Sequence, residues 1–252
     1  MLTEFDGIVW FAVLFIGLTV LQRVLHFEIQ AIFLLLTRRG EIALALFSLL
    51  FFPGVLLHEL SHFLMALALG VKTGHFSLFP QPLPDGRLRL GYVETQSTDL
   101  VRDALIGTAP LIVGSVFVVY AGLVQLDIPA LWESWVATGW RGFIESFSAM
   151  LGRPDFWLWF YLTFTVSSTM LPSRSDRRAW LPVGIFVGFV VILAVLVGAG
   201  AWMATNLAPL VNQGLRAFAI VIGISLAVHL ILLPPLWIVR RSLGRITGLS
   251  VA

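Results

Sequence analysis

The sequence contains no cysteine and few charged residues. Without cysteine there is neither a disulfide nor a thiolate metal ligand, so any bound metal must be held by nitrogen and oxygen atoms. Only 12% of the 252 residues are charged while 58% are hydrophobic, a balance that no soluble domain of this length needs to fill its core. A basic patch interleaved with aromatic residues is also missing, so we expect no nucleic acid as a partner. The composition predicts an integral membrane protein in contact with a lipid bilayer.

Uncharged stretches of sufficient length predict about six transmembrane helices. They lie at 7–22, 42–57 with a continuation to 71, 104–126, 156–173, 179–215 and 217–239. Within 179–215, a turn is expected at Asn206, Pro209 and Asn212. The apolar run 29–36 is too short to cross, and we expect an interfacial helix or a buried connector there. The predicted fold class is an all-α polytopic membrane protein, with a single membrane domain over residues 1–252.

The basic residues indicate an orientation for this multi-pass protein. Six alternating spans place ten of the 16 basic residues on one side, namely Lys72, Arg87, Arg89, Arg102, Arg174, Arg177, Arg178, Arg240, Arg241 and Arg245. The other side receives Arg23, Arg38, Arg39, Arg141, Arg153 and Arg216. Because positive charge is enriched on the cytoplasmic side, the count predicts a protein of the cell membrane with both termini in the cytoplasm.

A His-Glu-x-x-His motif, read as His58-Glu59-Leu60-Ser61-His62, lies in the second predicted span. Residues four apart share one face of a helix, so the two imidazoles can bind one ion. Zinc accepts nitrogen ligands, and Glu59 is then placed to act as a general base on metal-bound water. The alternative is a pair of core histidines that hydrogen-bond to carbonyl groups. Just before the motif, Pro53 and Gly54 predict either a kink that opens a groove or an ordinary proline kink of a membrane helix.

A catalytic zinc ion usually has three protein ligands, so a third side chain must come from elsewhere in the chain. The spacing of the residues does not choose among seven candidates: His26, His75, His229, Asp99, Asp103, Asp155 and Asp176. A metal site would require one of them to lie close to His58 and His62.

The chain from about 42 to 180 resembles the site-2 protease family of intramembrane zinc metalloproteases, as a divergent member. A span with the HELSH motif is preceded by one span and followed by a hairpin-like loop and two more spans, with further spans at about 7–25, 180–204 and 215–239. A later span of that family carries Asn-x-x-Pro-x-Pro-x-Leu-Asp-Gly, whose aspartate completes the zinc site. This chain reads Ser168-Thr169-Met170-Leu171-Pro172-Ser173-Arg174-Ser175-Asp176-Arg177 at the matching place.

The resemblance implies that Asp176 is the third zinc ligand. The chain departs from the family pattern in three ways: Thr169 replaces the asparagine, the interval from Pro172 to Asp176 is one residue shorter, and Arg177 replaces the glycine. The alternative is that Asp176 is a solvated charge among neighbouring arginines. Ser167, Ser168 and Thr169 are expected either to orient neighbouring groups or to bond to their own helix.

The stretch from Gly74 to Thr98 predicts a small β-hairpin after the motif helix. Phe76, Leu78 and the segment 87–93 alternate with the period of a strand, and Pro84-Asp85-Gly86 predicts the turn. The resemblance implies that this hairpin holds the substrate as an added strand. The alternative is a plain extramembrane hairpin. In the third span, a group of small residues is expected to permit close helix approach or local bending: Gly107, Ala109, Pro110 and Gly114.

The sequence therefore predicts an intramembrane zinc endopeptidase that cuts transmembrane proteins, with His58, His62 and Asp176 as ligands and Glu59 as the base. A non-catalytic relative that binds or escorts membrane proteins is the second hypothesis. A third is a different membrane zinc peptidase with a glutamate ligand, for which Glu94, Glu133 and Glu145 are available outside the spans. A transporter is disfavoured because no inverted repeat is visible. The substrate, the substrate-binding residues and the oligomeric state are not indicated.

Overall fold

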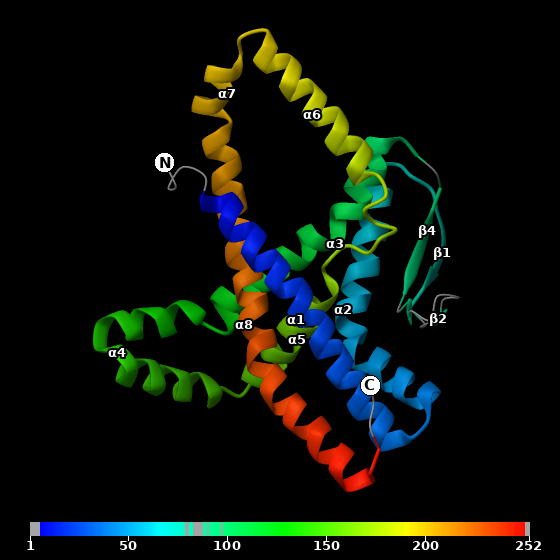
Figure 1. Cartoon of the computed structure of the whole chain (residues 1–252), viewed down its shortest axis with the longest axis vertical. Coiled ribbons are helices and arrows are strands. Elements are labelled where there is room, and N and C mark those ends of the chain that lie inside the picture. Colours follow the sequence, from blue (N-terminus) through cyan, green and yellow to red (C-terminus); the bar gives the residue numbers. More distant parts are fainter. Residues whose placement is uncertain (1–5, 79–80, 83–87, 90, 97, 250–252) are drawn as a thin grey trace.

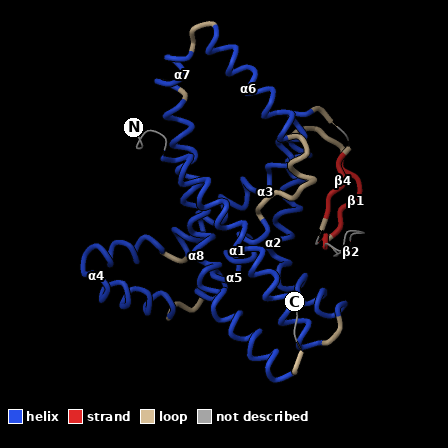
Figure 2. The backbone as a smooth tube through the Cα atoms, in the orientation of Figure 1, coloured by secondary structure: helices blue, strands red, loops and turns tan. Residues whose placement is uncertain are grey.

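The computed structural model describes residues 6–78, 81–82, 88–89, 91–96 and 98–249, which form an almost entirely helical protein (Figures 1 and 2). The helices are α1 (Asp6–Thr37), α2 (Gly40–Ala68), α3 (Leu100–Tyr120), a π-helical turn η1 (Ala121–Gln125), α4 (Ile128–Leu151), α5 (Phe156–Thr169), α6 (Trp180–Leu196), α7 (Gly200–Asn206) and α8 (Ala208–Thr247). Four short strands follow α2: β1 (Thr73–Ser77), β2 (Gln81–Pro82), β3 (Leu88–Arg89) and β4 (Tyr92–Thr95). The predicted all-α membrane class is confirmed.

Among the described residues, four helices are long and apolar enough to cross a membrane: α1, α2, α3 with η1, and α8. The pair α6 and α7, which is bent by 117°, makes a fifth if it counts as one span. The predicted number of six is not confirmed. The predicted span 156–173 is shorter than expected, since α5 has 14 residues and is about 21 Å long. That length does not cross about 30 Å of hydrocarbon, and α5 is instead packed among the other helices.

One predicted boundary is wrong, and another, the turn at Asn206, Pro209 and Asn212, is right only in part. The run 29–36 is neither a separate interfacial helix nor a connector, because α1 continues through it to Thr37. The break in the long apolar stretch 179–215 lies mainly between α6 and α7, at residues 197–199, and a second boundary falls at Leu207. Asn212 does not mark a turn, because it lies inside α8, where its side-chain oxygen accepts a hydrogen bond from the Gly7 N–H at 2.8 Å.

Helices α1 and α8 form a parallel pair (Figure 1). Asp6 pairs with Arg216 near the beginning of both helices, and Glu28 pairs with Arg240 further along both, each at 2.5 Å. Because 22 residues separate Asp6 from Glu28, the ion pairs lie about 33 Å apart along α1, close to the thickness of the hydrocarbon layer. The N-terminal end of α1 and the C-terminal end of α8 therefore lie at opposite ends of the pair.

A core of apolar side chains joins α2 and α5 to this pair. Phe51 of α2, Phe164 of α5 and Val228 of α8 belong to one buried cluster. Helix α2 is continuous through Pro53, and Gly54 is buried against α5. A Cβ at Gly54 would overlap the carbonyl oxygen of Thr165, so this glycine permits close packing of the two helices.

The strands lie beside the C-terminal part of α2 (Figure 1). β1 pairs antiparallel with β4, and β2 pairs antiparallel with β3. The predicted turn Pro84-Asp85-Gly86 falls outside the described residues. Helix α4, between α3 and α5, was not expected; it bends at Gly139, which has a φ of 66°, and exposes Trp132 and Trp140. Exposed tryptophans on such a helix are typical of a membrane interface.

Candidate metal centre

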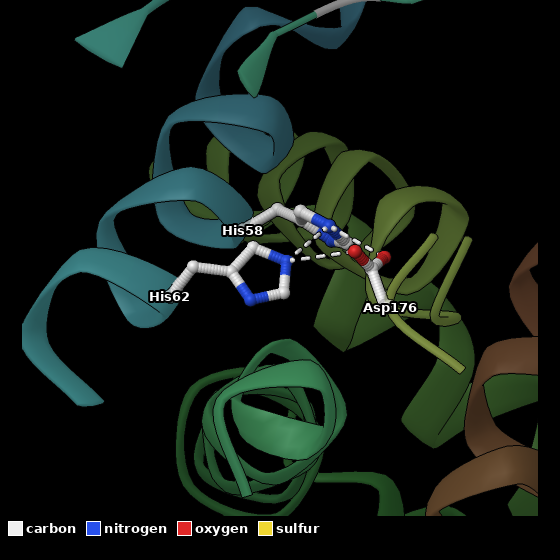
Figure 3. Close-up of side chains that lie close together, drawn as sticks. All are labelled: His58, His62 and Asp176. Carbon is white, nitrogen blue, oxygen red and sulfur yellow. Dashed lines mark hydrogen bonds and ion pairs between the residues drawn. The ribbon is translucent and has the colours of Figure 1, made fainter. Parts of the chain in front are cut away.

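His58 and His62 lie on one face of α2, as the motif spacing predicts, and their rings point toward the same place (Figure 3). The two Nε2 atoms are 3.2 Å apart. His62 is buried, and the His58 side chain is only 12% exposed. Two neutral imidazoles with their Nε2 atoms this close have converging lone pairs, which is the arrangement that a shared cation requires.

Asp176 reaches the same place from the loop between α5 and α6 (Figure 3). Its Oδ2 atom lies 3.6 Å from His58 Nε2, and its Oδ1 atom lies 3.5 Å from His62 Nε2. A tetrahedral zinc ion with bonds of about 2.0–2.1 Å separates its ligand atoms by about 3.3–3.4 Å. The two nitrogens are 3.2 Å apart, and each lies 3.5 or 3.6 Å from a different oxygen of Asp176. These separations are close to the tetrahedral value, so the two nitrogens and the Asp176 carboxylate can hold one ion.

Each histidine ring is fixed by a hydrogen bond on its far side. His58 Nδ1 lies 2.7 Å from the carbonyl oxygen of Thr169, and His62 Nδ1 lies 2.8 Å from that of Ile106. A carbonyl oxygen only accepts, so each Nδ1 carries the proton and donates it. The Nε2 atom of each neutral ring then has a free lone pair for a metal, the arrangement found at zinc-binding histidines.

The loop that carries Asp176 has a hydrogen bond within itself and is bonded to α3. Asp176 Oδ2 accepts a hydrogen bond from the Ser173 N–H at 2.6 Å. Two residues later, Arg178 binds Asp103 of α3 through two hydrogen bonds of 2.5 and 2.7 Å. The hydrogen bond with Asp103 raises the pKa of Arg178. A Cβ at Gly107 of α3 would overlap the backbone oxygen of Asp176, so the loop reaches the histidines only because residue 107 is glycine.

Of the other candidate ligands, His26 and Asp103 line the cavity around these three residues but do not join their group, and the rest lie elsewhere among the described residues. Asp99 caps the N-terminus of α3, Asp103 binds Arg178, and Asp155 precedes α5. His75 is exposed on β1, and His229 is hydrogen-bonded to Ser168. Within the part of the chain that the structure describes, only His58, His62 and Asp176 form a group that could hold a metal ion. That Asp176 is a ligand stays a prediction, which this geometry supports.

Glu59 faces a cavity of about 810 Å³ that also contains the three candidate ligands. Its side chain is buried, and a Cβ at Gly91, just before β4, would lie 2.9 Å from Glu59 Cγ. The cavity walls include β4 along its whole length, the end of α5, and Gln22 and His26 of α1. An acidic side chain beside a candidate metal site in such a cavity is in a position that a general base could occupy.

Sequence reasoning missed the groups that orient the histidines. Thr169 was noted for its hydroxyl, but that hydroxyl bonds to its own helix and only its carbonyl reaches His58. The Ser167 hydroxyl also stays within α5, whereas the Ser168 hydroxyl contacts α8. Ile106 also contributes through its backbone carbonyl. Every residue has such a carbonyl, so the residue type does not indicate this role in the sequence. The end of α5 is the one signal available for Thr169, because a helix terminus leaves its last carbonyls unpaired.

No protein-family model matches the chain, and no curated protein or solved structure matches it either. The resemblance to the site-2 protease family therefore rests on the motif residues quoted above.

Proposed function

We propose that this protein is an intramembrane zinc metalloprotease and a divergent relative of the site-2 protease family. The observation that carries the proposal is the convergence of His58, His62 and Asp176 at ligand separations of 3.2–3.6 Å. The donor set of two imidazole nitrogens and one carboxylate oxygen suits zinc and leaves a position for water or substrate. Glu59 is the residue that we assign to catalysis.

The bound zinc ion supplies a Lewis acid that makes water a stronger nucleophile. Glu59 takes a proton from the attacking water and returns it to the nitrogen of the leaving amine, so that the peptide bond is exchanged for a carboxylate and an amine. The hydrogen bonds from the two Nδ1 atoms to carbonyls hold His58 and His62 in the tautomer that presents Nε2.

We propose transmembrane proteins as the substrate class. A helical segment hides its carbonyls in internal hydrogen bonds, so it must be unwound before water can attack. β4 forms part of the cavity wall, and among the described residues it pairs only with β1. An unwound segment that pairs with β4 as an added strand would lie beside Glu59 with its carbonyls exposed. Helix-breaking residues in the substrate should therefore favour cleavage.

We also propose that the metal-binding half of α2 faces the cytoplasm, as the family resemblance implies. The expectation that both termini are cytoplasmic conflicts with the parallel α1–α8 pair, because both helices are apolar enough to cross the membrane and they run in the same direction. With the C-terminal end of α8 on the side of Arg38 and Arg39, the predicted excess of positive charge on one side disappears.

The test of the proposed activity is a Glu59→Gln substitution. The purified proteins are co-reconstituted in liposomes with a single-span reporter whose segment contains an Asn-Gly-Pro break. We expect the wild-type protein to cut the reporter and Glu59→Gln to cut it at least about 100-fold more slowly, since a general base contributes that much or more. Zinc content should be unchanged, because Glu59 is not a ligand. The matched control is Glu41→Gln, an exposed glutamate in the first turn of the same helix.

Two results would contradict the proposal. Equal cleavage by the wild-type protein and Glu59→Gln would remove Glu59 from the reaction. A wild-type protein that binds zinc but leaves every such reporter intact would favour the non-catalytic relative.

A further inference from the structure

We propose that Pro110, Gln22 and His229 are positioning residues of the metal centre, which act through the backbone carbonyls around His62 and His58. The inference rests on the metal centre of the proposed function, and it concerns how tightly that centre holds zinc. None of the three residues is assigned a contact with zinc. Each one instead determines where the carbonyl partner of a histidine ring lies.

The carbonyl that fixes His62 is free because of a proline. Ile106 lies inside α3, where its carbonyl oxygen would normally accept a hydrogen bond from the N–H of residue 110. That residue is Pro110, which has no N–H. The Ile106 oxygen accepts the His62 Nδ1–H at 2.8 Å instead. Pro110 is fully buried, and its helix α3 packs against α2. Because position 110 has no N–H, the Ile106 carbonyl oxygen stays available to His62.

The carbonyl that fixes His58 is free because α5 ends there. The helical donor to the Thr169 oxygen would be the Ser173 N–H, but this N–H is bonded to Asp176 Oδ2 at 2.6 Å. The Thr169 oxygen is left to accept the His58 Nδ1–H at 2.7 Å. The same break in the helix therefore provides a partner for His58 and a partner for Asp176.

Two distant helices hold the last turn of α5 in place through Ser168. The helical donor to the Ser168 carbonyl would be residue 172, which is Pro172 and has no N–H. Gln22 of α1 takes that role, because its Nε2 donates to the Ser168 carbonyl oxygen. The Ser168 hydroxyl lies 2.9 Å from Nε2 of His229 on α8. Ser168, the residue before Thr169, is thus held by side chains of two other helices, α1 and α8.

The protonation of His229 defines the direction of this contact. Its Nδ1 lies 2.8 Å from the Ser225 carbonyl oxygen and must donate to it, so Nε2 is the acceptor and the Ser168 hydroxyl is the donor. Ser168 and His229 are 1% and 0% exposed. Polar groups buried in a membrane helix are costly unless they bond to one another, and a displaced member forces its partners to move. Loss of the contact should therefore shift the last turn of α5.

The experiment compares zinc affinity and thermal stability of the full-length protein in detergent, with zinc and a competing chelator as the probes. Pro110→Ala restores an N–H that competes with His62 for the Ile106 oxygen, and Ser168→Ala removes the hydroxyl that bonds to His229. The matched controls are Pro234→Ala, an exposed proline inside α8, and Ser225→Ala, a buried serine whose hydroxyl bonds only to Val221 of its own helix.

We expect Pro110→Ala to weaken zinc binding about 10-fold, the lower end of the range for outer-shell changes, and Ser168→Ala to weaken it by a smaller factor. The controls should bind zinc like the wild-type protein. Alanine is a better helix former than proline, so Pro110→Ala should not lower the melting temperature. Weaker zinc binding at an unchanged melting temperature would therefore indicate that Pro110 positions the metal centre and does more than support the fold. Wild-type zinc affinity in Pro110→Ala, or equal losses in Ser168→Ala and Ser225→Ala, would overturn the inference. A wild-type protein without zinc affinity would overturn the metal centre itself.

Discussion

At the residue scale, the candidate metal centre depends on contacts that hold Asp176 against α3. The bidentate pair between Arg178 and Asp103 lies two residues from Asp176, and the Asp103 side chain is only 16% exposed. Gly107 allows the loop to touch the helix at the same point. Asp176, the proposed third ligand, lies on a loop, so these contacts determine its position. The positions of His58 and His62 are determined by the helix that carries them.

Arg178→Gln should weaken zinc binding by releasing this loop. The Arg178 side chain is 59% exposed, so solvent screens the ion pair and limits its contribution to at most about 1 kcal/mol, or roughly fivefold in zinc affinity. Arg174→Gln, which replaces an exposed arginine of the same loop, should leave zinc affinity unchanged. The measurement is a zinc titration of both variants against a chelator. A larger loss in Arg174→Gln than in Arg178→Gln would contradict this account of the loop.

The candidate site could be predicted from the sequence only where its residues share one helix. His58, Glu59 and His62 follow from helical spacing, which places the two histidines on one face. Asp176 lies on a loop 114 residues beyond His62, and no local sequence pattern determines where such a loop folds back. Asp176 was predicted from the family resemblance alone. The hydrogen-bond acceptors of the two histidine rings could not be predicted from the sequence, because they are backbone carbonyl groups. Pro110, four residues after Ile106, is a signal that could have been used.

At the scale of elements, the contact between α2 and α5 positions His58 relative to Thr169. Gly54 lies one turn before His58, and a Cβ there would overlap the Thr165 carbonyl and come within 2.5 Å of Thr169 Oγ1. The two helices therefore approach as closely as backbone atoms allow. This spacing brings the α5 carbonyl within hydrogen-bonding reach of the histidine ring.

Gly54→Ala should push α2 and α5 apart. Overpacking of a close contact typically costs about 1–3 kcal/mol, so we expect a lower melting temperature together with weaker zinc binding. Gly40→Ala is the matched control, since it adds the same methyl group to the same helix at a position with nothing within 4 Å. Melting curves and zinc titrations of the two variants check the prediction. It fails if Gly54→Ala is as stable as Gly40→Ala.

The elements themselves were predictable where hydropathy is continuous. Helices α2 and α3 with η1 match the predicted spans at 42–71 and 104–126 closely. The error at 29–36 arose because Arg23 and Glu28 interrupt the apolar run, whereas Glu28 is 4% exposed and paired with Arg240. A charge that is neutralised by a helix more than 200 residues away does not end a helix, and local sequence does not reveal that partner.

At the scale of the whole molecule, the parallel α1–α8 pair determines which ends of the chain share a membrane side. Helix α2 returns from the α1 end at Arg38 and Arg39, so the C-terminal end of α2 lies on the side where α1 begins. The C-terminal end of α8 lies on the side of Arg38 and Arg39. The positive-charge count assumed six alternating spans, whereas the described residues contain four helices long enough to cross, or five with the bent α6–α7 pair, so the alternation behind that count is not confirmed.

Labelling of single cysteines tests this topology, and the absence of native cysteine makes each introduced thiol unique. Gly40→Cys and Leu249→Cys should react with a membrane-impermeant maleimide from the same side of sealed vesicles. Lys72→Cys should react from the opposite side. Labelling of Leu249→Cys together with Lys72→Cys would restore the arrangement with both termini on one side and would contradict the parallel pair as a pair of spans.

The central claim is that His58, His62 and Asp176 bind one zinc ion, and metal analysis of the purified protein tests it most directly. We predict about one zinc ion per wild-type chain, and little or none in Asp176→Ala at the same chelator concentration. Asp155→Ala, which removes an exposed aspartate before α5, should retain the metal. Zinc retained equally in Asp176→Ala and the wild-type protein, or absent from the wild-type protein, would contradict the claim.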